Sequence, residues 1–466
     1  MIDIILTTIN AKWIHPSLAL RLLKANLGDL EPNCEIIEFN LRQPLREKTE
    51  PLLAAKPKIL GISVSIWNHL ATIELLEALE KEWISAAKPV IVLGGPEVSH
   101  LPADAEIFMF ADHVIRGEGE IAFRQLCENI LYKPLAETQG RRGRGEEEES
   151  LKSAYHLYSD EDVAKKLIYV ESSRGCPFKC DFCQSSLDEK AYEFPLEPFL
   201  AEMDTLIQRG VKTFKFLDRS FNTNIKRALK IINFFLSKVK QKPFTVHFEM
   251  VPSLFPDELI DALSRFPPGT LRLEIGIQTL NPEVSARINR PSNPDKELET
   301  LRLLIEKTSA IIHADLIAGL PGEDIESFGN GFDRLWLALN GGCLSSEPAD
   351  NTAFSGHHRT EIQLGILKFL PGTPVLRHCK DWKVLFNPLP PYEIVENATI
   401  SARDLFRLKN FARFWVQIAD RGLIKLENRA VFNKFLAFSD ELYAHFGRNW
   451  GIDKADLLQK TQNAVF

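Results

Sequence analysis

The sequence predicts an α/β protein with three parts: an N-terminal Rossmann-like, doubly wound parallel sheet, a central partial β/α barrel, and a small C-terminal α-helical domain. Three observations carry this prediction. Strand-like and helix-like segments alternate over the first 130 residues, a second alternation begins near residue 167, and the last ~90 residues lose it. The length of 466 residues also suggests about three domains, at roughly 150 residues each.

The N-terminal domain is expected at residues 1–135. Its connections are short and marked by Gly, Pro or Asn, and continuous apolar strands such as VIVL are what a sheet covered on both faces requires. The expected strands are 2–8, 34–40, 58–66, 89–95 and 112–117, and helical patterns include 17–27, 72–83 and 121–131.

A linker is expected at residues 136–165. Its core, ETQGRRGRGEEEESLKS, sets a basic block beside an acidic one with no apolar periodicity, so it cannot bury enough surface to offset its ordering entropy.

The barrel is expected at residues 166–378, where six strand candidates are each followed by a helix or loop. The strand candidates are 167–176, 212–218, 244–250, 272–278, 311–322 and 361–369. A polar insertion at 340–359 interrupts this pattern, and its composition indicates no function.

The C-terminal helical domain is expected at residues 379–466. Phe406, Phe411, Phe414 and Trp415 recur there at helical spacing, which is more typical of a buried core than of a cofactor site.

Composition excludes several classes of protein. Apolar residues make up 45% and charged residues 26%, as in ordinary globular domains. The net charge of -7 gives no general attraction to nucleic acid, and no apolar run reaches the ~18–20 residues of a membrane helix. The first residues lack a basic, then apolar, signal-peptide pattern, so a cytoplasmic location is expected.

Three of the seven cysteines lie within eight residues, in RGCPFKCDFC, directly after an apolar strand. Three thiolates on one tight loop can bind three irons of a [4Fe-4S] cluster and leave the fourth iron open. A structural zinc site would need a fourth ligand, and no second cysteine pair is nearby. The predicted metal ligands are Cys176, Cys180 and Cys183.

This segment resembles the signature of the radical S-adenosylmethionine (SAM) superfamily, CxxxCxΦC, in which Φ is aromatic. Cys176, Cys180, Phe182 and Cys183 match every position. The resemblance implies that SAM chelates the open iron and is reductively cleaved to methionine and a 5′-deoxyadenosyl radical, which abstracts a hydrogen atom from the substrate.

The resemblance extends to the later strand ends, where radical SAM enzymes contact SAM through polar residues and a glycine. Each carboxylate could equally form a salt bridge or a helix cap, but active sites of barrels are built at the carboxyl ends of strands. Together with Phe182, the SAM contacts implied by the resemblance are Asp218, Glu249, Glu274, Gln278 and Gly319.

Glycine-rich strand ends, LGGPE and RGEGE, mark the N-terminal domain, whereas the first turn lacks the GxGxxG of dinucleotide sites. Glycines there allow a ligand to approach the backbone closely, and turn glycines of an α/β domain are the alternative reading of this spacing. The order of the domains, however, resembles the cobalamin-binding radical SAM enzymes. By that resemblance, the residues that line a cobalamin pocket are Ser63, Ser65, Trp67, Gly94, Gly95, Gly117 and Glu118. The axial-histidine motif DxHxxG is absent, as is usual in this family.

The family implies a cobalamin-dependent enzyme, with C-methylation of an unactivated carbon as the leading activity. Oxidative cyclisation or rearrangement without methyl transfer is an alternative, and a non-catalytic cobalamin- or cluster-sensing protein is another. A methylthiotransferase is disfavoured, because only Cys34 and Cys127, far apart, occur in the N-terminal domain. A flavodoxin or ferredoxin is the expected electron donor, and the sequence names no substrate.

Overall fold

The computed structural model describes residues 2–83, 88–132, 151–188, 190–340, 360–424, 426 and 430–461. The chain divides into two compact units, Met1–Val170 with Glu197–Thr213, and Glu171–Leu196 with Phe214–Phe466. Within the described ranges, no helix is both long and apolar enough to cross a membrane.

The first unit contains a five-stranded sheet with the order β2-β1-β3-β4-β5. All four pairs of neighbouring strands are parallel. From β1 the chain proceeds to β2 on one side, and from β3 it proceeds to β4 and β5 on the other side. The connections after β1 and β3 therefore run in opposite directions, and α/β sheets typically bind ligands at such a point. The strands are β1 (Ile4–Asn10), β2 (Cys34–Asn40), β3 (Ile59–Ser63), β4 (Val90–Gly94) and β5 (His113–Val114).

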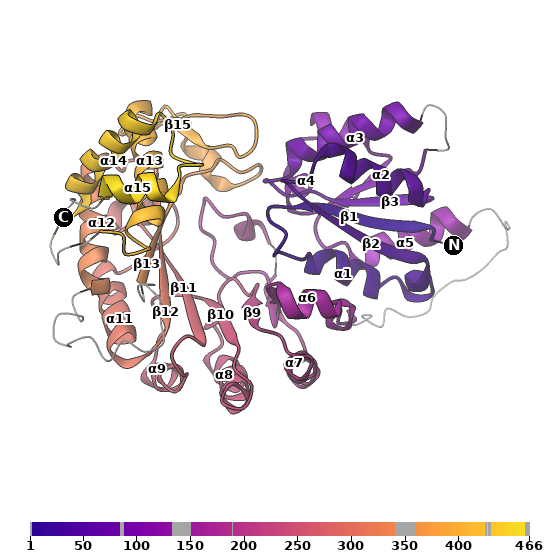
Figure 1. Cartoon of the computed structure of the whole chain (residues 1–466), viewed down its shortest axis with the longest axis horizontal. Helices are drawn as coiled ribbons and strands as arrows, with labels where there is room; N and C mark the ends of the chain where they lie inside the picture. The colour runs from indigo at the N-terminus through magenta and orange to yellow at the C-terminus, as the bar shows by residue number, and fades with distance from the viewer. Residues whose placement is uncertain are drawn as a thin grey trace. The chain divides into compact units, whose positions relative to one another are not determined.

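Both faces of this sheet are buried under helices, which confirms the doubly wound architecture (Figure 1). Strands covered on both faces do not need to alternate apolar and polar residues, and residues 4 to 6 of β1 are all apolar and fully buried. Side chains of α2 (Leu45–Ala55) and α3 (His69–Trp83) cover one face, and those of α1 (Leu18–Ala25) and α5 (Glu120–Tyr132) cover the other. Shorter elements are η1 (Gly28–Asn33), α4 (Pro96–His100) and η2 (Glu106–Phe110).

The predicted linker at 136–165 lies partly outside the described residues, which resume at 151. From there the chain folds into η3 (Tyr155–Leu157) and α6 (Asp160–Lys165). Arg21 of α1, which is 5% exposed, binds this segment: its guanidinium donates to Asp162 at 2.7 Å and also pairs with Glu38 of β2. The same guanidinium lies over the ring of Tyr158.

Replacement of Arg21 by alanine is expected to destabilise the first unit by about 3 kcal/mol, because Glu38 loses its cation while Asp162 retains Lys166 at 2.8 Å. Chemical denaturation followed by circular dichroism measures this loss. Arg46→Ala removes a guanidinium that is 84% exposed and paired only with Glu50, and it should leave the denaturation midpoint unchanged. Equal losses in the two variants would contradict a structural role for the buried network.

The larger sheet has six strands in the order β13-β12-β11-β10-β9-β6. Strands β10 to β13 pair in parallel, and the linear order leaves β13 and β6 as edges, which confirms a partial barrel. The strands are β6 (Ile168–Val170), β9 (Thr213–Phe216), β10 (Thr245–Met250), β11 (Leu271–Gln278), β12 (Ile311–Ala318) and β13 (Thr360–Ile366). The helices along this part are α7 (Leu196–Arg209), α8 (Ile225–Val239), α9 (Asp257–Ser264), α10 (Pro282–Arg287), α11 (Pro294–Lys307) and α12 (Ile325–Asn340).

The two faces of the larger sheet differ in polarity. Apolar residues on one face are buried against helices, as where Phe214 and Phe216 of β9 meet Phe235 of α8 edge to face. The other face carries charged and polar residues that stay half-buried, in strict alternation along β10 and β11. Polar side chains are thereby directed to the inner side of the partial barrel.

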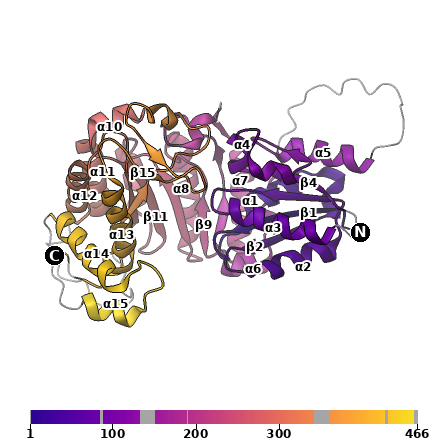
Figure 2. The ribbon, with the colours of Figure 1, turned by 90° about the horizontal axis from the view of Figure 1, so that it is seen from above.

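The C-terminal helices α13 (Ala402–Ile418) and α14 (Phe432–Phe446) pack against α12 in the second unit, and α15 (Lys454–Thr461) follows (Figure 2). Phe411, Phe414 and Trp415 are buried, and the rings of Phe411 and Trp415 pack against Phe332 of α12. Phe406 is 46% exposed and contacts Tyr443 instead. The aromatic stripe is thus mainly core, and the insertion at 341–359 lies outside the described residues.

Candidate functional site

The three clustered cysteines lie in the loop that connects β7 (Ser173–Arg174) to β8 (Tyr192–Glu193), two short strands that pair antiparallel, and η4 (Gln184–Leu187) lies between the last cysteine and β8. Gly175 starts the loop with φ +82°, and a Cβ there would lie 2.3 Å from the carbonyl oxygen of Lys190. Only glycine fits this turn. Cys180 is buried, and Cys176 and Cys183 are half-buried.

Backbone and side-chain hydrogen bonds hold the loop in place. The amide of Asp181 donates to the carbonyl of Ile288 at 2.9 Å, and Asn289 donates to the carbonyl of Lys179 at 2.7 Å. Lys179 in turn donates to the carbonyls of Ser186 and Asp188. The loop geometry is therefore fixed by the chain itself.

The environment of the thiols fits a cluster. Burial raises the pKa of Cys176 and Cys180, and the guanidinium of Arg290, 3.8 Å from the sulfur of Cys180, opposes this rise by favouring the thiolate. Across the described ranges, no three His, Cys, Asp or Glu side chains converge on the position of one metal ion. A cubane cluster does not require three side chains to converge on one point, because each cysteine binds a different iron.

Glu249, at the end of β10, is a predicted SAM contact that interacts with this loop. Its carboxylate interacts electrostatically with Cys176, and its carbonyl accepts from the amide of Phe221 at 3.0 Å. Burial raises the pKa of Glu249 to about 7, with Arg219 opposing the shift. A carboxyl group in this state can accept from, or donate to, a polar ligand near neutral pH.

Glu274, which pairs in register with Glu249, is engaged within the protein. Its carboxylate lies 2.9 Å from the ammonium of Lys215 and 3.1 Å from Nε2 of His247. The adjacent imidazole of His247 and the charge of Lys215 hold the pKa of Glu274 well below its usual range. It is therefore a fixed negative charge on the inner face of the sheet.

Gln278 ends β11 at a bulge, in the left-handed region with φ +70°. Its side chain folds back over Gly276, where a Cβ would lie 2.4 Å from Nε2 of Gln278. Arg290, which contacts Cys180, also donates to the carbonyl of Gly276. This arginine therefore joins the cysteine loop to the end of β11. The sequence analysis missed it, because a charged residue in an Asn- and Pro-rich loop has no distinguishing pattern.

Asp315 of β12 is a second residue that the sequence analysis did not select. One of its carboxylate oxygens, Oδ1, is buried and has no hydrogen-bond partner among the described residues. Burial, together with the nearby charges of Glu274 and Glu249, raises the pKa of Asp315 to about 8. A buried polar atom without a partner on the inner face is a candidate ligand contact.

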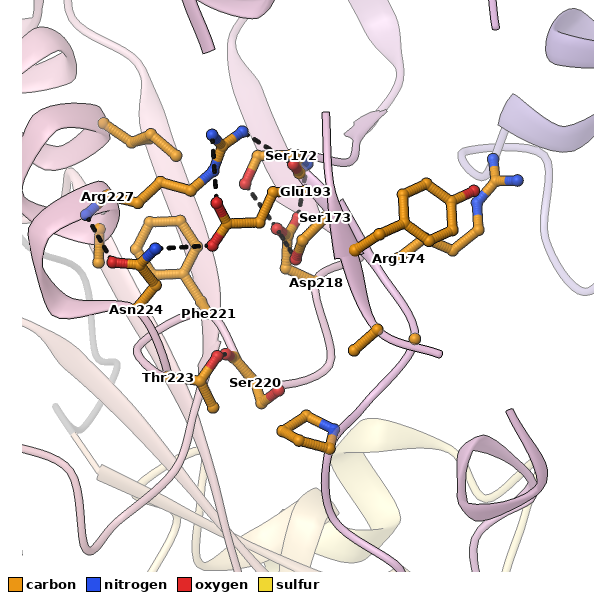
Figure 3. A pocket seen from close by; sticks show the side chains of 16 residues that line it. Ser172, Ser173, Arg174, Glu193, Asp218, Ser220, Phe221, Thr223, Asn224 and Arg227 are labelled. Atoms are coloured by element: carbon orange, nitrogen blue, oxygen red, sulfur yellow. Dashed lines mark hydrogen bonds and ion pairs between the residues drawn. The ribbon is translucent and has the colours of Figure 1, made fainter. Parts of the chain in front are cut away.

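Asp218 belongs to a network that fixes the chain before the cysteines. Figure 3 shows its carboxylate pointing at Ser172 and Ser173, whose hydroxyls donate at 2.6 and 2.7 Å. The amide of Ser172 donates as well, at 2.9 Å. With three donors and 1% exposure, the carboxylate of Asp218 is engaged within the protein. A small cavity of about 110 Å³ lies beside it.

Phe182 and Gly319 occupy different surroundings. Phe182 is half-buried in the cysteine loop. Gly319, after β12, has φ +91°, and a Cβ there would lie 2.8 Å from a methyl group of Ile394. The glycine is thus required by packing against β15 (Ile394–Glu396), which pairs with β14 (Leu385–Phe386).

Glu323 closes the loop after Gly319 and is 3% exposed. Its Oε1 accepts from the hydroxyl of Thr279 at 2.6 Å, and burial raises its pKa from 4.5 to about 7. Because the folded-state pKa lies above the unfolded value, this group's contribution to stability is present below pH 4.5 and is lost as the pH rises through 7.

We therefore expect Glu323→Gln to be more stable than the wild type at pH 8 by up to about 3 kcal/mol, and to lose this advantage at pH 5. Thermal unfolding of the unliganded protein at both pH values measures the difference. Glu326→Gln, at an exposed position of α12, serves as the control and should show no such change. A Glu323→Gln effect of equal size at both pH values would refute the raised pKa.

In the first unit, the loop after β3 carries three predicted cobalamin contacts. Ser63 ends β3, Ser65 is buried, and Trp67 is 51% exposed with its indole N–H donating to the carbonyl of Ile9 at 3.3 Å. Asn68, a residue missed by sequence reasoning, donates to the same carbonyl and accepts from the amide of Ser65. It ties the loop after β3 to the end of β1.

The glycine-rich ends of β4 and β5 lie beside this loop. Gly94 accepts from the amide of Val64, and Gly95 has φ +104° with its α-carbon packed against the backbone of Val64. Gly117, with φ +74°, has open space around it, and Glu118 is exposed next to it. The carboxyl ends of β3, β4 and β5 thus bring the predicted residues to one edge of the sheet.

A buried hydrogen bond lies behind this edge. Nδ1 of His69 is 2.8 Å from Glu97, and the two residues are 6% and 1% exposed. Glu97 belongs to the GGPE segment, and its amide also donates to the carbonyl of Val64. The acidic residue of this segment therefore anchors α4 to α3 rather than facing solvent.

Two family models match the chain. The B12 binding domain matches residues 4–127, and the Radical SAM superfamily matches residues 170–335. The uncharacterized methyltransferase PH0819 of Pyrococcus horikoshii is 26% identical over 263 residues, which are 51% of this chain and 55% of that protein. The cobalamin-dependent radical SAM methyltransferase TokK of Streptomyces tokunonensis is 24% identical over 330 residues, 64% of this chain and 47% of that protein.

The chain spans about half the length of these curated relatives. Among solved structures, the cobalamin-dependent S-adenosylmethionine radical enzyme OxsB, with aqua-cobalamin and S-adenosylmethionine bound, superposes with a TM-score of 0.61 and 14% identity. The match covers 98% of this chain and 78% of OxsB. At this identity the likeness concerns the fold.

Proposed function

Because the chain belongs to the cobalamin-binding radical SAM enzymes, we propose that it cleaves SAM reductively and C-methylates an unactivated carbon of its substrate, with cobalamin as the methyl carrier. One observation carries this proposal. A CxxxCxxC loop lies beside the half-buried carboxyl group of Glu249, in a chain that also contains a B12-binding domain. Two curated relatives that are named as methyltransferases, PH0819 and TokK, support the methyl-transfer step.

At the cysteine loop, a [4Fe-4S] cluster would supply an electron, and SAM would be the source of the hydrogen-abstracting radical. At the edge of the first sheet, cobalamin would supply a transferable methyl group. The residues for the cluster are Cys176, Cys180 and Cys183, with Arg290 as a cation against Cys180. A ligand with a carboxylate and an amine, such as the methionine part of SAM, finds Arg290 and Glu249 within the same unit.

Glu249, Gln278 and Asp315 would orient the polar parts of SAM from three neighbouring strands. Asp218 and Glu274 serve a different role in this proposal. Asp218 holds the segment before the cysteines through Ser172, and Glu274 neutralises the charge of Lys215 on the inner face. A reduced flavodoxin or ferredoxin, the family's usual donor, would deliver the electron.

An anaerobic experiment tests the proposal. The chain is purified with cobalamin supplied, iron and cobalt are counted, and 5′-deoxyadenosine and S-adenosylhomocysteine are assayed after reduction in the presence of SAM. About four irons, one cobalt and both products are expected. Deoxyadenosine without S-adenosylhomocysteine would favour cyclisation or rearrangement, and neither product would favour a non-catalytic binding protein.

A further inference from the structure

The residue between Cys180 and Phe182 is an aspartate with a buried charge. Asp181 is 1% exposed, and its Oδ2 lies 2.6 Å from Nη2 of Arg377 and 3.0 Å from Nε2 of His378. Both partners belong to η6 (Pro374–His378), which follows β13 almost two hundred residues further along the chain. A carboxylate buried to this degree needs such partners, because water no longer screens it.

The same segment also holds the backbone of the loop. The amide of Val375 in η6 donates to the carbonyl of Asp181 at 2.9 Å, while the amide of Asp181 donates to Ile288 on the other side. Asp181, in the middle of the cysteine loop, is thus fixed through its amide, its carbonyl and its side chain. Two of these three attachments come from η6.

We propose that η6 is a positioning element for the iron–sulfur loop, in which Arg377 and His378 hold Asp181, Arg377 balances its charge, and the reduction potential of the cluster is thereby set. This inference rests on the proposed function, because it requires that the loop binds a [4Fe-4S] cluster.

The physical reason is electrostatic. Reduction adds an electron to the cluster, so a nearby buried anion disfavours the reduced state and a nearby cation favours it. Asp181 is part of the loop and its side chain is withdrawn from water. Arg377, although its side chain is 57% exposed, places its guanidinium directly on that carboxylate.

The two single substitutions are therefore expected to act in opposite directions. Arg377→Gln leaves the charge of Asp181 less compensated, and should make the cluster harder to reduce. Asp181→Asn removes the anion and should make it easier to reduce. A change of up to about tenfold in the reduction equilibrium, which is 59 mV for a one-electron couple, is expected for each.

Potentiometry monitored by electron paramagnetic resonance measures these shifts in the anaerobically reconstituted full chain. Arg377→Lys should stay near the wild type, and the double variant Asp181→Asn/Arg377→Gln should return towards it. Arg403→Gln removes an exposed arginine of α13 and serves as the matched control.

Mere loosening of the loop would shift both single variants in the same direction, and that result would overturn the proposal, as would shifts no larger than that of Arg403→Gln. If both single variants lose iron, recovery of iron in the double variant would support the charge balance, and its failure there would overturn it. Absence of a cluster in the wild type would instead refute the proposed function.

Discussion

Cys180→Ala is expected to abolish reductive cleavage of SAM while leaving cobalamin binding intact. The thiol of Cys180 is the most buried of the three in the loop, and it is the one in contact with Arg290. Without it, one iron of the cluster has no protein ligand in addition to the iron that is open for SAM. The predicted cobalamin contacts, in contrast, belong to the other compact unit.

The measurement is 5′-deoxyadenosine formed per chain after anaerobic reduction with SAM, together with iron and cobalt content. We expect deoxyadenosine to fall to the level without reductant and cobalt to remain at the wild-type level. Cys127→Ala, which removes a buried thiol from α5, is the matched control and should retain both. Deoxyadenosine production by Cys180→Ala would mean that the cysteine loop does not bind the cluster.

Periodicity and turn residues were sufficient to predict most of the fold. The apolar runs of β1, β3 and β4 are buried on both faces, so composition alone marks them as central strands of a covered sheet. Helix α6 lies in the segment that was predicted as a linker. Its start has a local signal, since Ser159 and Asp162 form a capping box. The contact of Asp162 with the buried guanidinium of Arg21 in α1, in contrast, is indicated by no local pattern.

The site was predictable to the extent that its chemistry is local. The cysteine spacing identifies the loop, and the alternation along β10 and β11 directs Glu249 and Glu274 to one face. The partners of each carboxylate are not local, however. Asp218 is satisfied by serines 45 and 46 residues away, and Glu274 by Lys215 at a separation of 59, so residue type alone could not separate ligand contacts from internal ion pairs.

The distinction between ligand contacts and internal interactions also applies to the GGPE segment, where a glycine and an acidic residue have different roles. Glu97 is an internal anchor through His69, whereas Gly95 determines the path of the backbone at the edge of the sheet. A substitution that alters only this path therefore tests whether the edge formed by β3 and β4 binds cobalamin.

Gly95→Ala is expected to weaken cobalamin binding by at least about tenfold, which corresponds to ~1.4 kcal/mol. At φ +104° an alanine is strained, and its Cβ would lie 2.5 Å from the carbonyl oxygen and 2.9 Å from the amide nitrogen of Val64. Both are backbone atoms and cannot rotate away. The loop after β3, with Ser65 and Trp67, must therefore move away from the GGPE segment.

Equilibrium dialysis with hydroxocobalamin, read by the absorbance of the retained corrin, measures the change. Gly210→Ala separates backbone strain from steric contact, because Gly210 also has a positive φ, +93°, but open space where its Cβ would lie. Both variants lose stability through strain, but only Gly95→Ala displaces Val64, so only that variant should release cobalamin. Undiminished binding by Gly95→Ala would exclude this edge of the sheet as the cobalamin site, whereas equal weakening by the two variants would trace the loss to strain alone.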